Sequence, residues 1–387
     1  MRKYQVISAD GHLEAMTFSD PKYMPAKYKD IAPRLVKKDD GTDWWVMGEY
    51  ESKNAGNLYS GARYNEWVRP MASSYHFADG TPRPGTGDNV SRLREQDEDG
   101  IDAEVLYAPA QGARFYRLYV KSNPGAHIAL HQAYNSFVAD YCSIAPDRLI
   151  GTATLPETGV ADAIKEMERV RKLGTRAISL AVWPNGSMYA KPEEDDRFWA
   201  AALDLDMKIA PHKHFGGTSI AGTAQGPDPT AASCLTGFTP VEGVPQCMAQ
   251  LLVHGTFDRF PKLCIYFAET NPGYLGYLMN AIDENYLRYK WFFDIKLKKM
   301  PSQYYRDHSR YSFIHDRMTM KYRYDIGVDL LMWGSDTPHS ISTYPNSREI
   351  LSELFEDVPE AERHQVLVGN VCKFFDLDPD KELTPTP

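Results

Sequence analysis

The stretch 149-LIGTATLPETGVADAIKEMERVRKLGTRAISLAV-182 decides the fold class. Its two ends, residues 149–155 and 176–182, are short apolar runs of the length of a strand. Residues 160–173 between them mix apolar and charged positions in the pattern of an amphipathic helix. A strand, a helix and a second strand in this order predict two parallel strands joined by a crossover helix.

The same alternation of short apolar runs and amphipathic segments recurs along the chain. Runs of strand length occur at residues 4–9, 103–107, 149–155, 176–182, 207–211, 263–268, 311–314 and 330–334. Eight strands with intervening helices predict an α/β fold, the (β/α)₈ barrel, and 387 residues suit one such barrel with insertions. We therefore expect a single domain over residues 1–387. Residues 18–90, rich in Pro, Gly, Asp and aromatics, are expected to form an insertion over the barrel after the first strand.

Composition and charge restrict the classes of partner. Hydrophobic residues make up 43% of the chain, and a net charge of −9 comes without any cluster of Lys or Arg. Nucleic-acid binding needs concentrated positive charge, so we expect no such partner. The first residues do not resemble a secretory signal, and no run of about 18 apolar residues could span a membrane. Five cysteines without paired spacing indicate reduced thiols, so we expect a cytoplasmic protein with no membrane contact.

Several side chains that can bind a metal follow the predicted strands. Asp10 and His12 follow the first strand, and His212 and His214 follow the fifth. Glu269 follows the sixth strand and Asp336 the eighth. In a barrel the active site lies at the carboxyl ends of the strands, so these side chains converge. Alternate residues of an extended segment share a face, which places Asp10 beside His12 and His212 beside His214. Imidazole and carboxylate ligands suit zinc, iron or manganese, so the sequence predicts a metal site.

Some residues near the predicted site allow two interpretations. His339, three residues past Asp336, either contacts the substrate as a catalytic residue or bonds the adjoining loop backbone, and we take it as the candidate catalytic residue. Glu14 either reaches the metal pocket or faces water, and we expect it to face water. The aromatic side chains of the insertion either line a substrate pocket or pack the insertion onto the barrel; they are Trp44, Trp45, Trp67, Tyr75 and Phe77.

Five short motifs resemble those of the amidohydrolase-2 family, the group of aminocarboxymuconate-semialdehyde decarboxylase and related aromatic-acid decarboxylases. They lie at residues 7–12, 257–261, 267–269, 334–339 and 369–370. The resemblance implies that Asp10, His12, His212 and Asp336 are metal ligands, and that the protein is a homodimer. Two positions depart from the pattern that is usual for hydrolases of the family. Asp10 replaces the first histidine of the usual pair, and Glu269 stands where the sixth strand often provides a histidine.

The number of candidate ligands bears on the reaction. Six exceed the three or four that a single zinc-type metal needs. We therefore expect two iron ions (or iron and manganese) and a monooxygenase that uses O₂ to hydroxylate an organic acid or an acyl natural-product intermediate. In this the chain is similar to a subgroup of the family that includes a diterpenoid hydroxylase. The alternative is a mononuclear hydrolase or non-oxidative decarboxylase of an aromatic or related carboxylic acid, with a single Zn or Mn. A non-catalytic subunit is a third possibility, against which the retained ligands argue.

Overall fold

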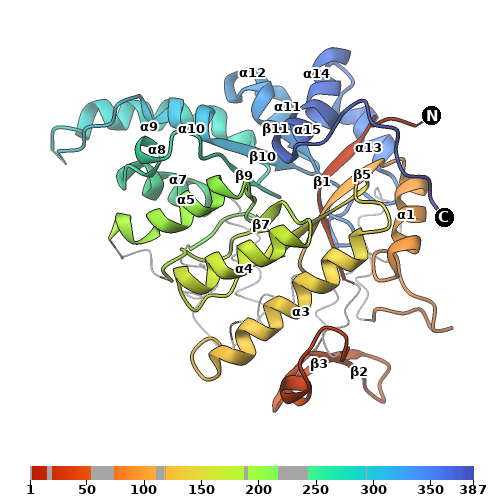
Figure 1. Ribbon diagram of the computed structural model, residues 1–387. Coiled ribbons are helices and arrows are strands. Elements are labelled where there is room, and N and C mark those ends of the chain that lie inside the picture. Colours follow the sequence, from red (N-terminus) through yellow and green to blue (C-terminus); the bar gives the residue numbers. More distant parts are fainter. Residues whose placement is uncertain are drawn as a thin grey trace.

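The computed structural model describes residues 2–14, 20–53, 74–109, 117, 119–186, 191–216, 243–292 and 294–387. Its main element is a parallel sheet of eight strands wrapped by helices (Figure 1). In sheet order the strands are β1 (Ile7–His12), β5 (Ala103–Tyr107), β6 (Leu149–Thr154), β7 (Ala177–Ser179), β8 (Lys208–Ile209), β9 (Ile265–Phe267), β10 (Ser309–Phe313) and β11 (Leu331–Trp333). Each neighbouring pair is parallel.

The sheet closes on itself through the segments after β1 and β11. The Asp336 N–H donates to the Asp10 carbonyl oxygen at 2.9 Å, and the His12 N–H donates to the Thr337 carbonyl oxygen at 2.6 Å. These bonds join the first strand to the last, so the prediction of a (β/α)₈ barrel is confirmed. The first strand differs from its prediction, because it covers Ile7–His12 rather than residues 4–9. Asp10 and His12 therefore belong to the strand itself.

Helices cover the outside of the barrel. The longer ones are α1 (Asn89–Asp99), α3 (Pro124–Cys142), α4 (Val160–Lys172), α5 (Asp196–Asp204), α7 (Gly243–Val253), α9 (Leu275–Tyr289), α10 (Pro301–His308) and α13 (Ser347–Leu354). The shorter ones are α8 (Thr256–Arg259), α11 (Arg317–Lys321), α12 (Arg323–Ile326), α14 (Glu360–His364) and α15 (Asn370–Phe375). None of the helices in the described part of the chain is long and apolar enough to cross a membrane.

Helix α4 shows why these segments form and pack as they do. Its buried positions include Val160, Ala163, Met167 and Val170, which are spaced three or four residues apart and so form one stripe along the helix. The basic side chains of its last turn are favourably placed against the negative end of the helix dipole. Gly174, with φ 95°, ends the segment and allows the chain to turn back towards β7.

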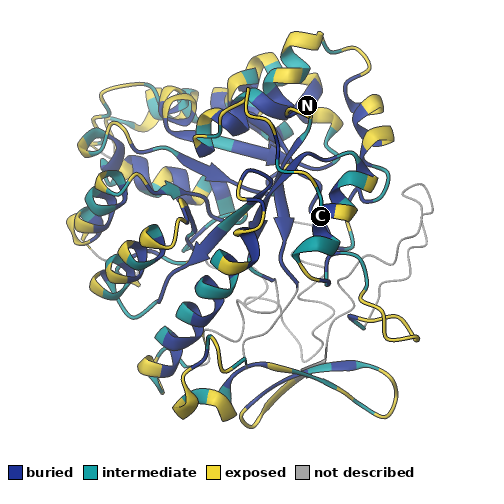
Figure 2. Cartoon of the chain, turned by 45° about the vertical axis from the view of Figure 1, so that its right-hand side comes forward, coloured by how far each residue is buried: buried dark blue, intermediate teal, exposed yellow. Residues whose placement is uncertain are grey.

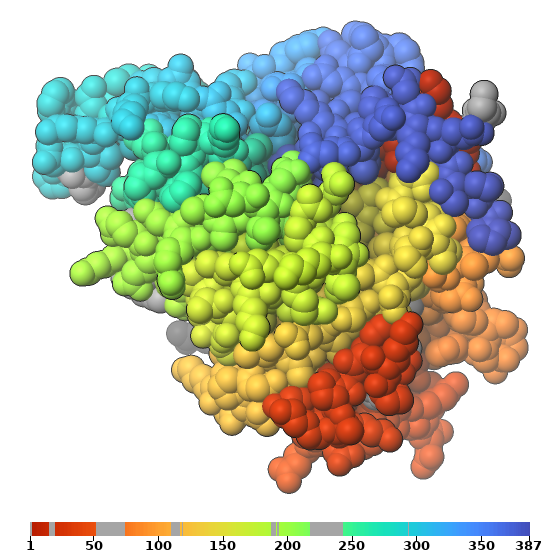
Figure 3. Space-filling model, viewed as in Figure 1, coloured from red at the N-terminus to blue at the C-terminus, as the bar shows by residue number. Residues whose placement is uncertain are grey.

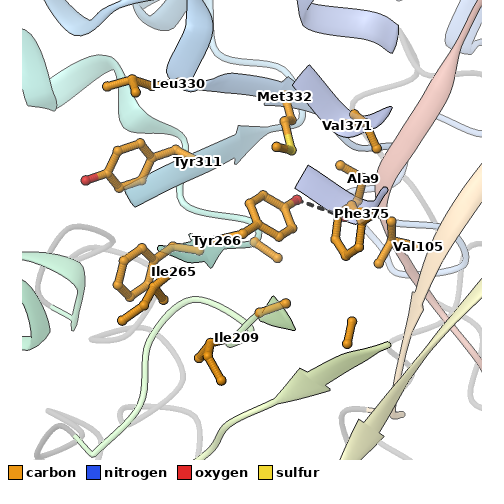
Figure 4. Close-up of a cluster of buried hydrophobic side chains, with 14 of the residues drawn as sticks. Ala9, Val105, Ile209, Ile265, Tyr266, Tyr311, Leu330, Met332, Val371 and Phe375 are labelled. Carbon is orange, nitrogen blue, oxygen red and sulfur yellow. Dashed lines mark hydrogen bonds between the residues drawn. The ribbon is translucent and has the colours of Figure 1, made fainter. Parts of the chain in front are cut away.

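The barrel core is made of apolar side chains from neighbouring strands. Figure 2 shows that the barrel strands are mostly buried, while the helices are exposed on one face. In Figure 4, Ala9, Val105, Ile209 and Tyr266 come from four different strands and lie in one cluster. The Tyr266 hydroxyl donates to the carbonyl oxygen of Ala9 at 2.8 Å. This bond fixes the backbone directly before Asp10.

A second, smaller sheet lies outside the barrel, within the predicted insertion. Its antiparallel strands are β2 (Arg34–Lys37), β3 (Asp43–Met47) and β4 (Tyr50–Lys53). Trp45 and Met47 of β3 are buried in a cluster that includes Leu130 and Tyr134 of α3. Figure 3 shows this part of the chain against the outside of the barrel. Trp67 lies outside the described residues, and the extent of the insertion, residues 18–90, stays a prediction.

We predict that Gly334→Ala weakens the barrel at its closure. A Cβ at residue 334 would lie 2.5 Å from the Asp10 Cβ and 3.0 Å from the Asp10 backbone nitrogen, so the two strands must separate. Overpacking of this kind costs about 1–3 kcal/mol of unfolding free energy. Chemical denaturation measures the loss, and Gly369→Ala is the control, because a Cβ there comes no closer than 4.0 Å to a neighbour. Equal stability of the two variants would contradict the close approach of the strands.

Candidate metal centre

Four side chains converge at the carboxyl ends of β1, β8 and β11. One ligand atom of each of Asp10, His12, His212 and Asp336 lies within 4.8 Å of those of the other three. The His12 Nε2 is 3.0 Å from the His212 Nε2 and 3.2 Å from Asp336 Oδ1. Asp10 Oδ1 is 3.7 Å from the His212 Nε2. Two imidazole nitrogens and two carboxylates therefore face a common point.

The chain bends sharply around this point. Lys213, Glu269 and Asp336 have φ angles of 60°, 54° and 55°, in the left-handed region. Such angles are uncommon for residues other than glycine, and strained backbone of this kind is found often at functional sites. Each of the three lies shortly after a barrel strand. Their side chains therefore do not follow the alternation that the strand would impose.

The bend at Lys213 separates the two histidines that flank it. The His214 N–H donates to the His212 carbonyl oxygen at 2.8 Å, which closes a three-residue γ-turn centred on Lys213. The prediction that His212 and His214 share a face assumed an extended backbone. In the structure His212 joins the group of four, whereas His214 packs against Gly243 and lies outside it. Glu269 also lies outside that group but beside it, because its Oε2 is 3.2 Å from the His212 Nε2.

The electrostatics of the group fit a cation. Within the described part of the chain, none of the four carboxylate oxygens of Asp10 and Asp336 has a well-formed hydrogen bond, although both side chains are buried. Burial, the charge of Asp336 and that of Glu269 raise the pKa of Asp10 well above its ordinary value. Burial would also raise the pKa of Asp336, but its contacts with histidines outweigh this and hold that pKa below its ordinary value.

The two histidines of the group suit a metal as well. Burial lowers the pKa of His12, and burial together with the nearness of His12 lowers that of His212 well below the ordinary value. Both shifts favour the neutral imidazole, whose nitrogen can bind a metal. The His12 Nδ1 lies 3.0 Å from the Ala108 carbonyl oxygen, which leaves Nε2 free to face the centre. Two neutral histidines and two buried carboxylates fit a single divalent ion.

His339, the candidate catalytic residue, also lies at this centre. Its Nδ1 is 3.1 Å from Asp336 Oδ1, and its ring stacks on that of His12 with 3.7 Å between centroids. Burial by itself lowers the pKa of His339, but contacts with Asp336 and Glu14 reverse the effect and raise it well above the ordinary value. His339 thus contacts two of the four candidate ligands through its side chain.

A chain of buried polar groups connects His339 with the insertion. Glu14 Oε1 lies 3.4 Å from the His339 Nε2, and Glu14 Oε2 accepts a hydrogen bond from the Tyr75 hydroxyl at 3.1 Å. The Trp45 Nε1 donates to the same hydroxyl at 3.3 Å. Glu14 is buried, so the expectation that it faces water is wrong. Tyr75 and Trp45 pack the insertion onto the barrel and also hold Glu14 against His339.

A buried ion pair supports the loop that carries Asp336, and the sequence analysis missed it. The Arg92 Nε of α1 donates to Glu104 Oε2 of β5 at 2.7 Å, and both side chains are 2% exposed. Arg92 Nη2 donates to the Thr337 carbonyl oxygen at 3.0 Å, and Glu104 accepts a bond from the Ser335 hydroxyl at 3.3 Å. The pair therefore holds the backbone after Asp336 and the side chain of the residue before it. No local motif indicates this role, because Thr337 and Ser335 lie 245 and 231 positions after the residues that bind them.

Comparison with known proteins identifies the family. Residues 108–377 match the model of the amidohydrolases (Amidohydro_2), which is more than half of the chain. The chain belongs to the amidohydrolase family. The resemblance inferred from the sequence motifs is therefore confirmed.

Individual relatives in this family have named reactions. The 2-amino-3-carboxymuconate-6-semialdehyde decarboxylase of Dictyostelium discoideum is 22% identical over 300 residues, 76% of this chain and 77% of that protein. An amidohydrolase structure from Mycobacterium avium subsp. paratuberculosis matches with a TM-score of 0.75 at 18% identity, over 97% of this chain and all of that one. A 5-carboxyvanillate decarboxylase from Novosphingobium aromaticivorans, complexed with manganese, matches with a TM-score of 0.60 at 20% identity, over 74% and 79% of the chains.

These relatives overturn the predicted reaction. Those with a named reaction are decarboxylases, so the prediction of a dinuclear iron monooxygenase, and with it of an oxidoreductase, is wrong. Two of the solved decarboxylases contain manganese, and the two predicted iron ions find no support. O₂ was expected as a substrate only because of the predicted monooxygenase reaction, so that expectation has no support either. The physical basis of the prediction was a set of six ligands, of which the described structure brings four into one group.

We predict that Asp10→Asn and His212→Ala each lower the affinity for Mn²⁺ by at least about 100-fold, since even outer partners of a metal site contribute 10–100-fold. His214→Ala is the control and is expected to keep one ion per chain. Elemental analysis gives the metal content, and the rise of the melting temperature with added Mn²⁺ reports binding independently. Loss of the ion from His214→Ala alone would show that the four residues are not the ligand set.

Proposed function

We propose that this protein is a non-oxidative decarboxylase that removes CO₂ from an aromatic or related carboxylic acid with a single bound manganese or zinc ion. The observation that carries the proposal is the convergence of Asp10, His12, His212 and Asp336 beside an acid, Glu269, whose side chain is 8% exposed. A catalytic site of this type uses about three or four protein ligands and leaves a position for the substrate. The decarboxylases among the relatives support the same reaction.

The four ligands would hold the ion, which when bound supplies a Lewis acid that orients an anionic substrate. Asp10, His12 and Asp336 are at most 2% exposed, so they exclude water from their side of the centre. The His212 side chain is 25% exposed, which marks the side from which a substrate can approach. His339 stacks on His12 and contacts Asp336, and in this way it keeps both ligands in place.

The reaction needs a proton at the carbon that loses the carboxylate. The bond between the ring carbon and the carboxylate carbon breaks and CO₂ leaves. The electron pair of that bond stays on the ring carbon and takes up one proton. Glu269 is the group that we assign to deliver this proton. Burial and the charge of Asp336 raise its pKa to about 7, so a fraction of it is protonated at neutral pH. The Ser312 hydroxyl accepts the Glu269 N–H at 2.9 Å and fixes the backbone that carries the acid.

Release of CO₂ tests the proposal. The protein loaded with Mn²⁺ is expected to release CO₂ from a member of a panel of aromatic acids that includes 2,6-dihydroxybenzoate and 5-carboxyvanillate. Release should continue without oxygen and stop when the metal is removed by a chelator, because the reaction needs a Lewis acid but no oxidant. Mass spectrometry of the headspace and of the product measures it. Turnover that consumes O₂, or hydrolysis of amides or esters without CO₂ release, would refute the proposal.

We further predict that Glu269→Gln lowers kcat by about 10²–10⁴-fold, the ordinary contribution of a general acid. The amide keeps the size of the side chain but cannot donate the proton that the carbon needs. The control is Glu284→Gln on α9, where the glutamate is exposed and pairs with Arg288. Metal content is measured alongside kcat, and a Glu269→Gln enzyme with its metal and full turnover would contradict the assignment.

A further inference from the structure

Lys213 places a positive charge beside the candidate metal ligands. Its Nζ lies 3.0 Å from Glu269 Oε1, and the other oxygen of the same carboxylate lies 3.2 Å from the His212 Nε2. The Lys213 N–H donates to the carbonyl oxygen of Ala268 at 2.8 Å, which ties the backbone of the γ-turn to the segment after β9. The ammonium is therefore separated from a candidate ligand by one carboxylate group.

The γ-turn at Lys213 is the reason that its side chain lies there. In an extended strand Lys213 would point away from the face that carries His212. With φ 60° at Lys213, the strand pattern is broken, and the side chain meets Glu269. The γ-turn with positive φ is rare and strained, so it persists only where the surrounding structure holds it. Because the strained residue lies directly beside the metal centre, the strain indicates that its side chain has a function there.

Exposure increases from the ligands towards Lys213. The side chains of Asp10 and Asp336 are 0% and 1% exposed, that of His212 is 25% exposed and that of Lys213 is 50% exposed. An ammonium group has three donors, and Glu269 is its one partner among the described residues. As far as the described residues go, donors thus remain for a molecule that approaches from the side of His212.

The charges of the described side chains favour an anion at this position. Asp10 and Asp336 carry two negative charges when ionised, and a divalent metal ion would offset both. Glu269 adds a third negative charge whenever it has given up its proton, and the Lys213 ammonium 3.0 Å away offsets it. Without Lys213, a carboxylate substrate would meet the deprotonated Glu269 with no cation beside it, and like charges at short distance repel strongly in a partly buried site.

We infer that Lys213 binds the carboxylate group of the substrate and makes the site selective for acids over their decarboxylated products. The inference rests on the proposed function, because it assigns a substrate class to the same site. The ammonium shares its donors between Glu269 and the incoming carboxylate. Product release follows from the same contact: once CO₂ has left, the neutral ring has no group for Lys213 to hold.

Calorimetric binding to the Mn²⁺-loaded protein tests this. The probes are two pairs that differ by one carboxylate: 2,6-dihydroxybenzoate with resorcinol, and salicylate with phenol. Lys213→Met is expected to weaken binding of the acids by about 10–100-fold, the effect of losing one charged hydrogen bond, and that of the neutral probes by less than about threefold. Lys213→Arg keeps the charge and is expected to retain most of the affinity. Lys208→Met is the control, because Lys208 begins the same strand, β8, and pairs with Asp206 and Asp376.

The outcomes separate this inference from the proposed reaction. Selective loss of acid binding in Lys213→Met, with metal content unchanged, supports the inference whether or not CO₂ is released. Unchanged acid affinity, an equal loss for acids and neutral probes, or no binding of either acid by the wild-type protein overturns it. Acid binding that depends on Lys213, without CO₂ release from any acid, would instead refute the decarboxylase and leave Lys213 as an anion-binding residue.

Discussion

The contact between β1 and the segment after β11 is the constraint on which the site depends. Two backbone hydrogen bonds and the absence of a side chain at Gly334 bring the end of the barrel against its beginning. The same contact places Asp10 and Asp336 in the interior next to each other. Two buried carboxylates repel when both are ionised, and the pKa of Asp10 is raised for this reason as well as by burial. A cation between them would remove that cost, so closing the barrel and binding a metal favour one another.

Groups outside the ligand set hold this arrangement in place. Arg92 and Glu104 hold the residues on both sides of Asp336, and Tyr266 fixes the carbonyl group before Asp10. Glu14 links His339 to Tyr75 of the insertion. A site that must keep its ligands close together needs such support, because each ligand alone could rotate away. The insertion therefore contributes to the order of the centre, although it lies outside the barrel.

Much of this could be predicted from the sequence. Short apolar runs at regular intervals predicted the barrel, and the strand Ala103–Tyr107 has the bounds expected for it. Asp10, His12, His212 and Asp336 were predicted as ligands because parallel strands bring their carboxyl ends to one edge, a property of the fold rather than of any one residue. The structure groups four of the six predicted ligands, and His214 lies outside that group for a local reason. The pattern of residues does not show the sign of φ, so an extended backbone was assumed at Lys213, and His214 was placed beside His212.

The burial of Glu14 and the role of the Arg92–Glu104 pair could not be predicted either, because both depend on contacts with distant residues. Glu14 looks like the start of a loop in the sequence, but Tyr75, 61 residues later, covers it and donates to it. The pair of Arg92 and Glu104 owes its role to Thr337, 245 positions after Arg92. Contacts over such distances depend on the packed structure. They cannot be read from the local pattern that reveals strands and helices.

The most direct test of the account is an anomalous-diffraction measurement on crystals of the protein equilibrated with Mn²⁺. A single-metal centre gives one peak of anomalous density per chain, within coordination distance of Asp10, His12, His212 and Asp336. A second peak about 3.5–4 Å from the first, the spacing of a two-metal site, would contradict the central claim of a single-metal centre. So would a single peak bound by His214 in place of His212.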